Sequence, residues 1–223
     1  SINPMDWNIQ NKIISMMIVV LIVALGVMAV LNYVSLSNSA INSTSDSLGS
    51  IGNEAIQRAV EVINGDIKSL QALALSPSLI RSVQLANGTY EGKTESEIQT
   101  MIADLDQQWV DNAPEIEPLV QDMLINATSD EVNTFMKTFP NEVEVFITDK
   151  YGMNIGMSAR TGDYWQGDEG WWQKAFTGET SLSAISFDES ANTYAMNIGV
   201  PVLSSRTQEI IGVLRGTVNV TAV

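Results

Sequence analysis

The sequence predicts an α+β chain in which an apolar helix and several further helices precede an antiparallel sheet of five strands. Three observations predict this order. An uncharged apolar run lies near the N-terminus, apolar residues recur at helical spacing up to Pro140, and they alternate in the strand pattern after it. We expect four parts: a short tail at 1–12, a transmembrane helix at 13–34, a helical stalk and helical part of the domain at 35–140, and the sheet with a ligand pocket at 141–223.

The composition excludes several classes of function. The net charge is −15, from 26 acidic and 11 basic residues, so neither nucleic acid nor an anionic membrane surface is an expected partner. The chain contains no histidine and no cysteine, which excludes disulfides, thiol chemistry, histidine acid–base catalysis and most zinc sites. We therefore expect no cofactor and no metal.

The apolar run from Ile13 to Leu31 contains 19 residues without a charge, and a helix extended through Val34 can cross a hydrocarbon core of about 30 Å. A cleaved signal peptide has a shorter apolar region of about 7–15 residues, so we expect an uncleaved, single-pass anchor in the cell membrane. Lys12 precedes the run, and the next basic residue is Arg58. The positive-inside rule then places the N-terminus in the cytoplasm and everything after Val34 outside the cell.

Helical spacing continues between the anchor and Pro140. The segment after Val34 is rich in serine and asparagine, so it is either a linker or a continuation of the anchor helix. The next apolar residues follow at spacings of 4, 3, 4, 3 and 4, a heptad seam suited to packing on a sheet or on a second copy of the chain. We therefore expect a homo-oligomer assembled through the N-terminal helices. The seam consists of Ile56, Val60, Ile63, Ile67, Leu70 and Ala74.

The alternating pattern after Pro140 divides into five strands with short turns. The sequence Asp149-Lys150-Tyr151-Gly152 is a tight-turn signal between the first two strands. Short turns and one helical insertion after the second strand indicate an antiparallel sheet covered by helices. The expected strands are Glu142–Thr148, a return strand through Met153, Ile155 and Met157, then Ser181–Phe187, Thr193–Leu203 and Glu209–Ala222.

The segment from Asp163 to Phe176, DYWQGDEGWWQKAF, holds three of the chain's five tryptophans beside two carboxylates. Aromatic faces beside carboxylates suit a cationic or amphipathic small ligand, through cation–π contacts and charge-assisted hydrogen bonds. The alternative is that the rings simply plug one end of the sheet, since most buried aromatic side chains serve packing. The residues concerned are Tyr164, Trp165, Asp168, Glu169, Trp171 and Trp172.

Several motifs occur in an order that resembles a known family. A helix containing IKSLQALALSPSLIRSV is followed by VFITDKYGMNIGMS, the aromatic segment, AMNIGVPVL and IIGVLRGTVNV. This order is similar to that of the Cache family, the PAS-like extracytoplasmic sensor domains of chemoreceptors, sensor histidine kinases and cyclases. The resemblance covers roughly residues 56–220 and implies a five-stranded antiparallel sheet backed by the long N-terminal helix. It also implies a ligand pocket between the sheet and the segment with the tryptophan pair.

One position departs from the pattern of this family. Amino-acid-binding members carry arginine two positions before the aromatic pair, where it holds the ligand carboxylate, and this chain has Glu169 there. The charge is reversed and a bidentate clamp is lost, so we expect an amine or another cation instead of an ordinary α-amino acid. Under this resemblance the remaining candidate contacts are Phe187, Asp188, Tyr194 and Asn197.

Two functions fit these features. The first, and our main interpretation, is an anchored, outward-facing sensor module that binds a small molecule and shifts the long helix on binding. The second is a structural surface protein whose apolar N-terminal helix assembles into a filament; the expectation that favours it is the end of the chain at Val223 without an output domain. An enzyme is not expected, because Asp168 and Glu169 are adjacent and no nucleophile–base pair or phosphate loop is visible.

Four N-x-S/T sequons permit glycosylation if the chain is exported. Their asparagines are Asn42, Asn87, Asn126 and Asn219.

Overall fold

A computed structural model describes most of the chain, which divides into two units, Ser1–Gln57 and Arg58–Val223. Most of the expected tail at 1–12 and the side chain of the sequon residue Asn42 lie outside the described residues. The structure describes 9–188 and 192–221, without the side chains of 9–12, 37–48 and 188.

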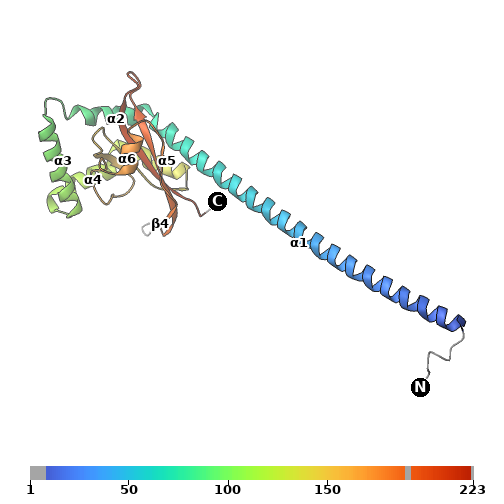
Figure 1. The fold of residues 1–223 in the computed structure, drawn as a ribbon. Helices are drawn as coiled ribbons and strands as arrows, with labels where there is room; N and C mark the ends of the chain where they lie inside the picture. Colours follow the sequence, from blue (N-terminus) through green and yellow to red (C-terminus); the bar gives the residue numbers. More distant parts are fainter. Residues whose placement is uncertain (1–8, 189–191, 222–223) are drawn as a thin grey trace. The chain divides into compact units, whose positions relative to one another are not determined.

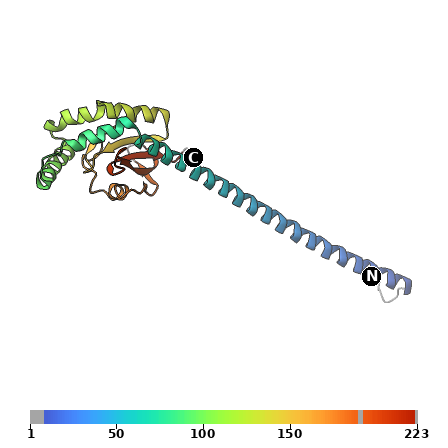
Figure 2. The ribbon, with the colours of Figure 1, turned by 90° about the horizontal axis from the view of Figure 1, so that it is seen from above.

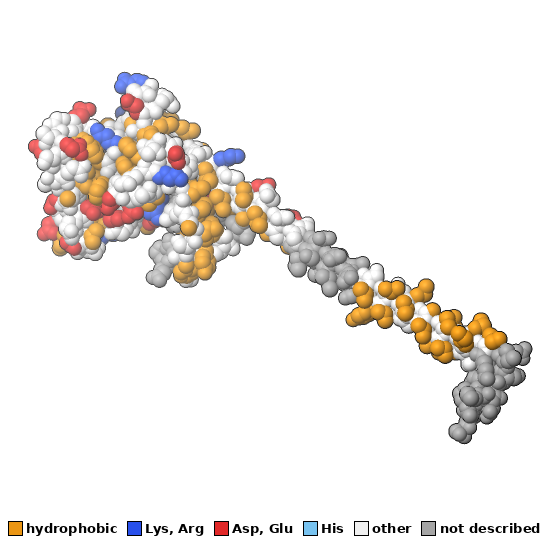
Figure 3. All heavy atoms as spheres, viewed as in Figure 1, with side chains coloured by type: hydrophobic (Ala, Val, Ile, Leu, Met, Phe, Trp, Pro, Cys, Tyr) orange, Lys and Arg blue, Asp and Glu red, His pale blue; other side chains and the backbone are white. Residues whose placement is uncertain are grey.

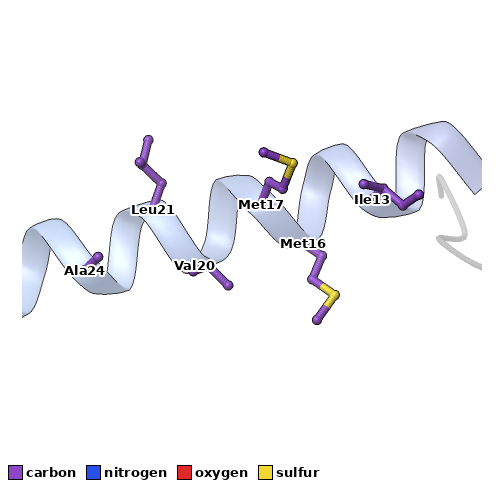
Figure 4. Close-up of a pocket in the computed structure, with 6 residues that line it drawn as sticks. All are labelled: Ile13, Met16, Met17, Val20, Leu21 and Ala24. Carbon is purple, nitrogen blue, oxygen red and sulfur yellow. The ribbon is translucent and has the colours of Figure 1, made fainter.

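The first helix, α1 (Ile9–Ala74), begins inside the expected tail and runs through the serine-rich segment, so that segment is helix and not a linker. Its apolar stretch, Ile13–Leu36, has a mean hydropathy of 3.0 and is the one segment of the described chain long and apolar enough to cross a membrane. The side chains there are exposed (Figure 3). Met17 and Leu21 project to one side and Met16 and Val20 to the other (Figure 4). A shallow hollow between these side chains is lined by residues of α1 alone, so we interpret the hollow as part of the helix surface and not as a binding site. A helix that is apolar on all sides is typical of a membrane span.

In the described residues, the second unit contains the end of α1 and five further α-helices, of which four precede the sheet (Figure 1). Pro77 occupies the first turn of α2, where its missing N–H costs nothing. Thr94 and Glu97 form a capping box at the start of α3, and the Asn126 side chain caps α5 by accepting from the Ser129 N–H. These helices are α2 (Pro77–Gly88), α3 (Glu95–Val110), α4 (Glu117–Ile125) and α5 (Ala127–Thr138), with a 3-10 turn, η2 (Pro114–Ile116), before α4.

The described strands form one antiparallel sheet of the order β2-β1-β6-β5-β3, with β4 also paired to β5. The α+β fold class is therefore confirmed. The expected third strand, Ser181–Phe187, is instead two short strands, because the Ser183 hydroxyl accepts the Asn197 N–H and the chain gains one residue relative to β5. The strands are β1 (Glu142–Thr148), β2 (Asn154–Met157), β3 (Ser181–Leu182), β4 (Ser186–Asp188), β5 (Thr193–Leu203) and β6 (Ile210–Asn219).

The two faces of the sheet are covered by different helices (Figure 2). One face packs on α1, α2 and α5 in a core that includes Leu70, Leu79, Val132, Ile198 and Leu214. On the other face, α6 (Gly170–Ala175) places its apolar side against β6. The heptad seam of α1 thus packs on the sheet at its C-terminal end, while its first residues stay exposed.

Candidate functional site

The tryptophan pair lies on α6, and Trp172 is used for packing. Its indole N–H donates to the Thr148 hydroxyl at 2.9 Å, and its ring stacks on Phe176 with centroids 4.6 Å apart. The side chain is buried and belongs to a small cluster with Ala175 and Val213. Trp172 therefore joins α6 to the sheet, as in the packing alternative for this segment.

Trp171 is half-buried on the same face and already has a cation against its ring. Its ring meets Phe146 edge to face, with centroids 5.9 Å apart. The guanidinium carbon of Arg215 lies 5.2 Å from both ring centroids. This is cation–π geometry, supplied from within the chain by β6.

The remaining predicted residues are distributed over the sheet. Asp168 and Glu169 are exposed, and Glu169 is the N-cap residue of α6 without a side-chain capping bond. Asn197 lies on the tryptophan face, where its amide oxygen accepts from the Thr217 hydroxyl at 2.9 Å.

Tyr194 is three residues before Asn197 on the same strand, so it faces the opposite side of the sheet. It pairs with Phe187 (centroids 5.4 Å apart), and both are about half exposed; Asp188 follows in β4, with its side chain outside the description.

Tyr164 and Trp165 are held by an acid that the sequence did not single out for this role. The backbone N–H groups of both residues donate to the same oxygen of Asp106, each at 2.9 Å. The Tyr164 ring is buried and stacks on Trp109, with centroids 5.0 Å apart, while the Trp165 indole donates to the carbonyl of Tyr151. Asp106 therefore fixes the aromatic segment against α3.

A cavity of about 570 Å³ lies on the helical side of Tyr164, between α2, α3, α4 and the β1–β2 hairpin. Of the ten residues predicted for ligand contact, Tyr164 is the one that lines it. Its apolar walls include Leu85, Met101, Leu105 and Met123, and its polar lining includes Tyr90, Asp122, Asp149 and Asn154. Among these described lining residues there are two carboxylates and no basic group, so the cavity favours positive charge.

Asp149 and Tyr90 form a buried hydrogen-bonded pair in this cavity. The Tyr90 hydroxyl donates to Asp149, whose other carboxyl oxygen accepts from the backbone N–H groups of Tyr151 (2.8 Å) and Met153 (3.0 Å). Burial raises the pKa of the Asp149 carboxyl, and these hydrogen bonds partly offset that effect. Burial and then the charge of Asp149 raise the pKa of the Tyr90 hydroxyl, which keeps its proton.

Asn154 contributes a buried hydrogen-bond acceptor. Its side chain is fully buried, and its amide nitrogen donates to the Thr161 hydroxyl at 2.8 Å. Its amide oxygen meets no donor within the described residues. A buried acceptor without a donor costs free energy. Nothing in the sequence pattern singled out this residue beyond its place in the return strand.

The sequon asparagines that the structure describes take part in internal hydrogen bonds. The amide nitrogen of Asn87 donates to the carbonyl of Ile211 at 2.7 Å, and that of Asn126 to the carbonyl of Ile155 at 2.9 Å. The amide oxygen of Asn219 accepts from the Thr221 N–H. Glycosylation at these positions stays a prediction.

No family model matches the chain, and no curated protein matches it. Solved structures are similar to it. The ligand-binding domain of the Campylobacter jejuni chemoreceptor Tlp3, in complex with 4-methylisoleucine, is 16% identical with a TM-score of 0.35, and the match covers 68% of this chain and 59% of that one. The sensor domain of the V. cholerae histidine kinase DctB is 13% identical (TM-score 0.37, 71% and 58%).

A third similar structure is the ligand-binding domain of the Pseudomonas aeruginosa amino acid chemoreceptor PctC in complex with GABA, which is 17% identical with a TM-score of 0.35 (57% and 60%). All three are ligand-binding or sensor domains of a chemoreceptor or a histidine kinase. The chain spans about three fifths of the length of these solved chains.

Proposed function

We propose that this chain is a membrane-anchored, outward-facing sensor module that binds a small cationic or amphipathic molecule without chemical conversion. The observation that carries the proposal is the cavity beside Tyr164, which combines apolar walls with two carboxylates. Such a concave, mostly apolar site with a few converging polar groups is typical of small-molecule binding.

The lining favours a protonated amine with an apolar body. An ammonium group gains attraction from Asp149 and Asp122. Burial raises the pKa of the Tyr164 hydroxyl, and the charges of these two carboxylates raise it further. The aromatic faces of Tyr90 and Tyr164 add cation–π attraction, and the methionine and leucine walls accept the hydrocarbon. A carboxylate ligand would meet two like charges there.

The tryptophan face remains the other location predicted from the sequence. Trp165, Asp168, Glu169, Trp171, Trp172, Asp188 and Asn197 stay predictions as ligand contacts, together with Phe187 and Tyr194 on the opposite face. Substitution of Trp171 by alanine separates the two locations, because it removes a ring that does not line the cavity.

Thermal-shift screening of the full chain in detergent tests the binding function. We expect primary amines with apolar bodies to raise the unfolding temperature, because a ligand that binds only the folded state stabilises it by mass action. Stabilisation by dicarboxylates alone would contradict the cationic ligand class. Absence of stabilisation by amines, amino acids and carboxylates would contradict the sensor function itself.

The anchored topology predicts a clear labelling pattern. Because the chain has no cysteine, single cysteines introduced at Ser205 and Asn3 report the two sides of the membrane separately. Ser205 is exposed, so we expect its cysteine to react with an impermeant maleimide in intact cells, whereas the Asn3 cysteine reacts only after permeabilisation. The opposite pattern would overturn the proposed orientation.

We also propose self-association through the N-terminal helices. The support is that Ile56 and Val60, the first residues of the heptad seam, are 60% and 47% exposed, which leaves their apolar surface for a second copy. Light scattering of the chain in detergent measures the mass of the protein in each particle. A multiple of the chain mass is expected, and the mass of a single chain would contradict self-association.

A further inference from the structure

Two acidic side chains are buried where α1 packs on the sheet. Glu142, the first residue of β1, is 3% exposed, and Asp66 on α1 is 7% exposed. Neither lines the cavity of the proposed ligand site. Acids this deeply buried are rare in proteins unless a partner neutralises them.

An irregularity in β1 turns Glu142 toward the helix. Glu142 is opposite Val218 on β6, whereas Glu144 is opposite the adjacent residue, Thr217, so a β-bulge places the two glutamates on opposite faces of the sheet. Val218 belongs to the core that contains Leu70 of α1. Glu142 therefore faces the packing surface of α1.

Gly216 on β6 provides the space for this carboxyl. A Cβ atom at this position would lie 2.6 Å from Oε2 of Glu142 and 2.7 Å from the methyl groups of Leu70. The carboxyl of Glu142 is thus enclosed between a strand backbone and a core leucine of α1.

No cation of the described residues neutralises the pair. The two carboxyl oxygens of Glu142 and Oδ2 of Asp66 have no hydrogen-bond partner within the described part of the chain. The charged neighbours on α1, Arg58, Glu61 and Lys68, are exposed, as is Lys137 on α5. Arg215 on β6 is on the opposite face, over Phe146 and Trp171.

Two buried carboxylates in one apolar interface cannot both be charged without a large cost, so the pair must hold a proton. Burial first, and then the negative charge of Asp66, raises the pKa of Glu142 to about 8. Burial also raises the pKa of Asp66.

We propose that Asp66 and Glu142 form a proton-binding site that couples pH to the packing of α1 on the sheet. With the proton bound, the interface is neutral and the helix packs on the core. When the proton leaves, negative charge enters the interface and loosens residues 58–74. This role is independent of the proposed ligand cavity, and its ligand is the proton.

The sign of the effect follows from linkage. In the unfolded chain Glu142 loses its proton near pH 4.5, its ordinary value, and in the folded chain only near pH 8. Between these values folding takes up a proton, so stability falls as pH rises through this window and the contribution is fully lost above it. One such proton changes the unfolding constant about tenfold per pH unit.

Urea unfolding of the full chain in detergent, followed by tryptophan fluorescence from pH 5 to 9, tests this. In the unmodified chain, we expect the pH dependence of the unfolding constant to include the uptake of about one proton on folding. In Glu142→Gln, we expect this uptake to be smaller by about one proton. Glu115→Gln, at an exposed position, serves as the control and should parallel the unmodified chain. Parallel behaviour of Glu142→Gln would overturn the proposal.

Two further measurements do not depend on that variant folding. In the unmodified chain, infrared spectra should lose a buried carboxylic acid C=O band between pH 6 and pH 9, and retention of all such bands would overturn the proposal. Hydrogen exchange, corrected for the intrinsic effect of pH, should increase above pH 8 in peptides from residues 58–74 but not in those from α3. Equal change in both would contradict a local effect on α1.

Discussion

Replacing Gly152 by alanine is expected to destabilise the folded unit by about 3 kcal/mol or more. Gly152 has φ +91°, a conformation that L side chains rarely adopt. A Cβ there would lie 2.6 Å from the Cα of Gly167 and would also overlap the Gly167 nitrogen, so a backbone and not a flexible side chain has to move. The strain and the overlap each contribute roughly 1–3 kcal/mol.

The close approach exists because Gly152 receives the aromatic segment. The carbonyl of Gly152 accepts from the Gln166 N–H at 2.8 Å, and the neighbouring Met153 forms a β-bridge with Trp165. Gly152→Ala should therefore loosen the loop that carries Tyr164 as well as lower stability.

The measurement for Gly152→Ala is thermal unfolding of the full chain, with an expected fall in Tm of about 10 °C for a unit of this size. Gly92→Ala is the matched control, since Gly92 also has positive φ (+80°) but no atom within 4 Å of the added carbon. It isolates the cost of the backbone conformation, of the order of 1 kcal/mol. Equal losses in both variants would show that the contact with Gly167 has no energetic weight.

The elements that the sequence predicted well are those with strong local signals. The helical spacing before Pro140 depends on residues three or four positions apart, and the turn at Asp149–Gly152 depends on four consecutive residues, so both could be read from short stretches of sequence. The split of the expected third strand was not predictable in this way. It depends on a hydrogen bond between Ser183 and Asn197, which are 14 residues apart.

In the candidate site, too, local sequence signals were predictable and contacts between distant residues were not. Tyr164 was singled out from the aromatic segment, but the cavity it lines is completed by Tyr90, Asp122 and Asn154, which come from three other parts of the chain. No spacing in the sequence relates these residues. Likewise, the motif pattern predicts Trp171 as a ligand contact, whereas the cation beside its ring is supplied by Arg215, 44 positions later on β6.

Reversing the charge of Asp122 is expected to change both the strength and the class of ligand binding. Asp122 lines the cavity, is exposed, and its charge reaches Tyr164. A ligand ammonium about 5 Å from a carboxylate gains about 1–3 kcal/mol at effective dielectric constants between 80 and 20. Asp122→Lys removes this attraction and adds repulsion, so amine affinity should fall at least about tenfold even with screening by salt.

Isothermal titration of the amine that stabilises the unmodified chain measures this fall. Glu115→Lys is the matched control, because it changes the net charge equally at an exposed residue that does not line the cavity, and we expect less than a twofold effect. Equal weakening in both variants would assign the effect to the total charge of the chain. In Asp122→Lys we also expect a gain in affinity for carboxylates, since the rim then offers them a cation.

A cavity-filling variant decides whether the amine enters this cavity at all. Ala86 is a half-buried lining residue on α2 for which no side-chain hydrogen bond has to be broken. Ala86→Phe should exclude ligands of either charge, whereas Ala184→Phe, at an exposed position between β3 and β4, should leave binding unchanged. If Ala86→Phe and Asp122→Lys bind the amine normally while Trp171→Ala does not, the ligand lies on the tryptophan face instead. The acidic lining of the cavity would then be a solvent-facing feature of the helical layer.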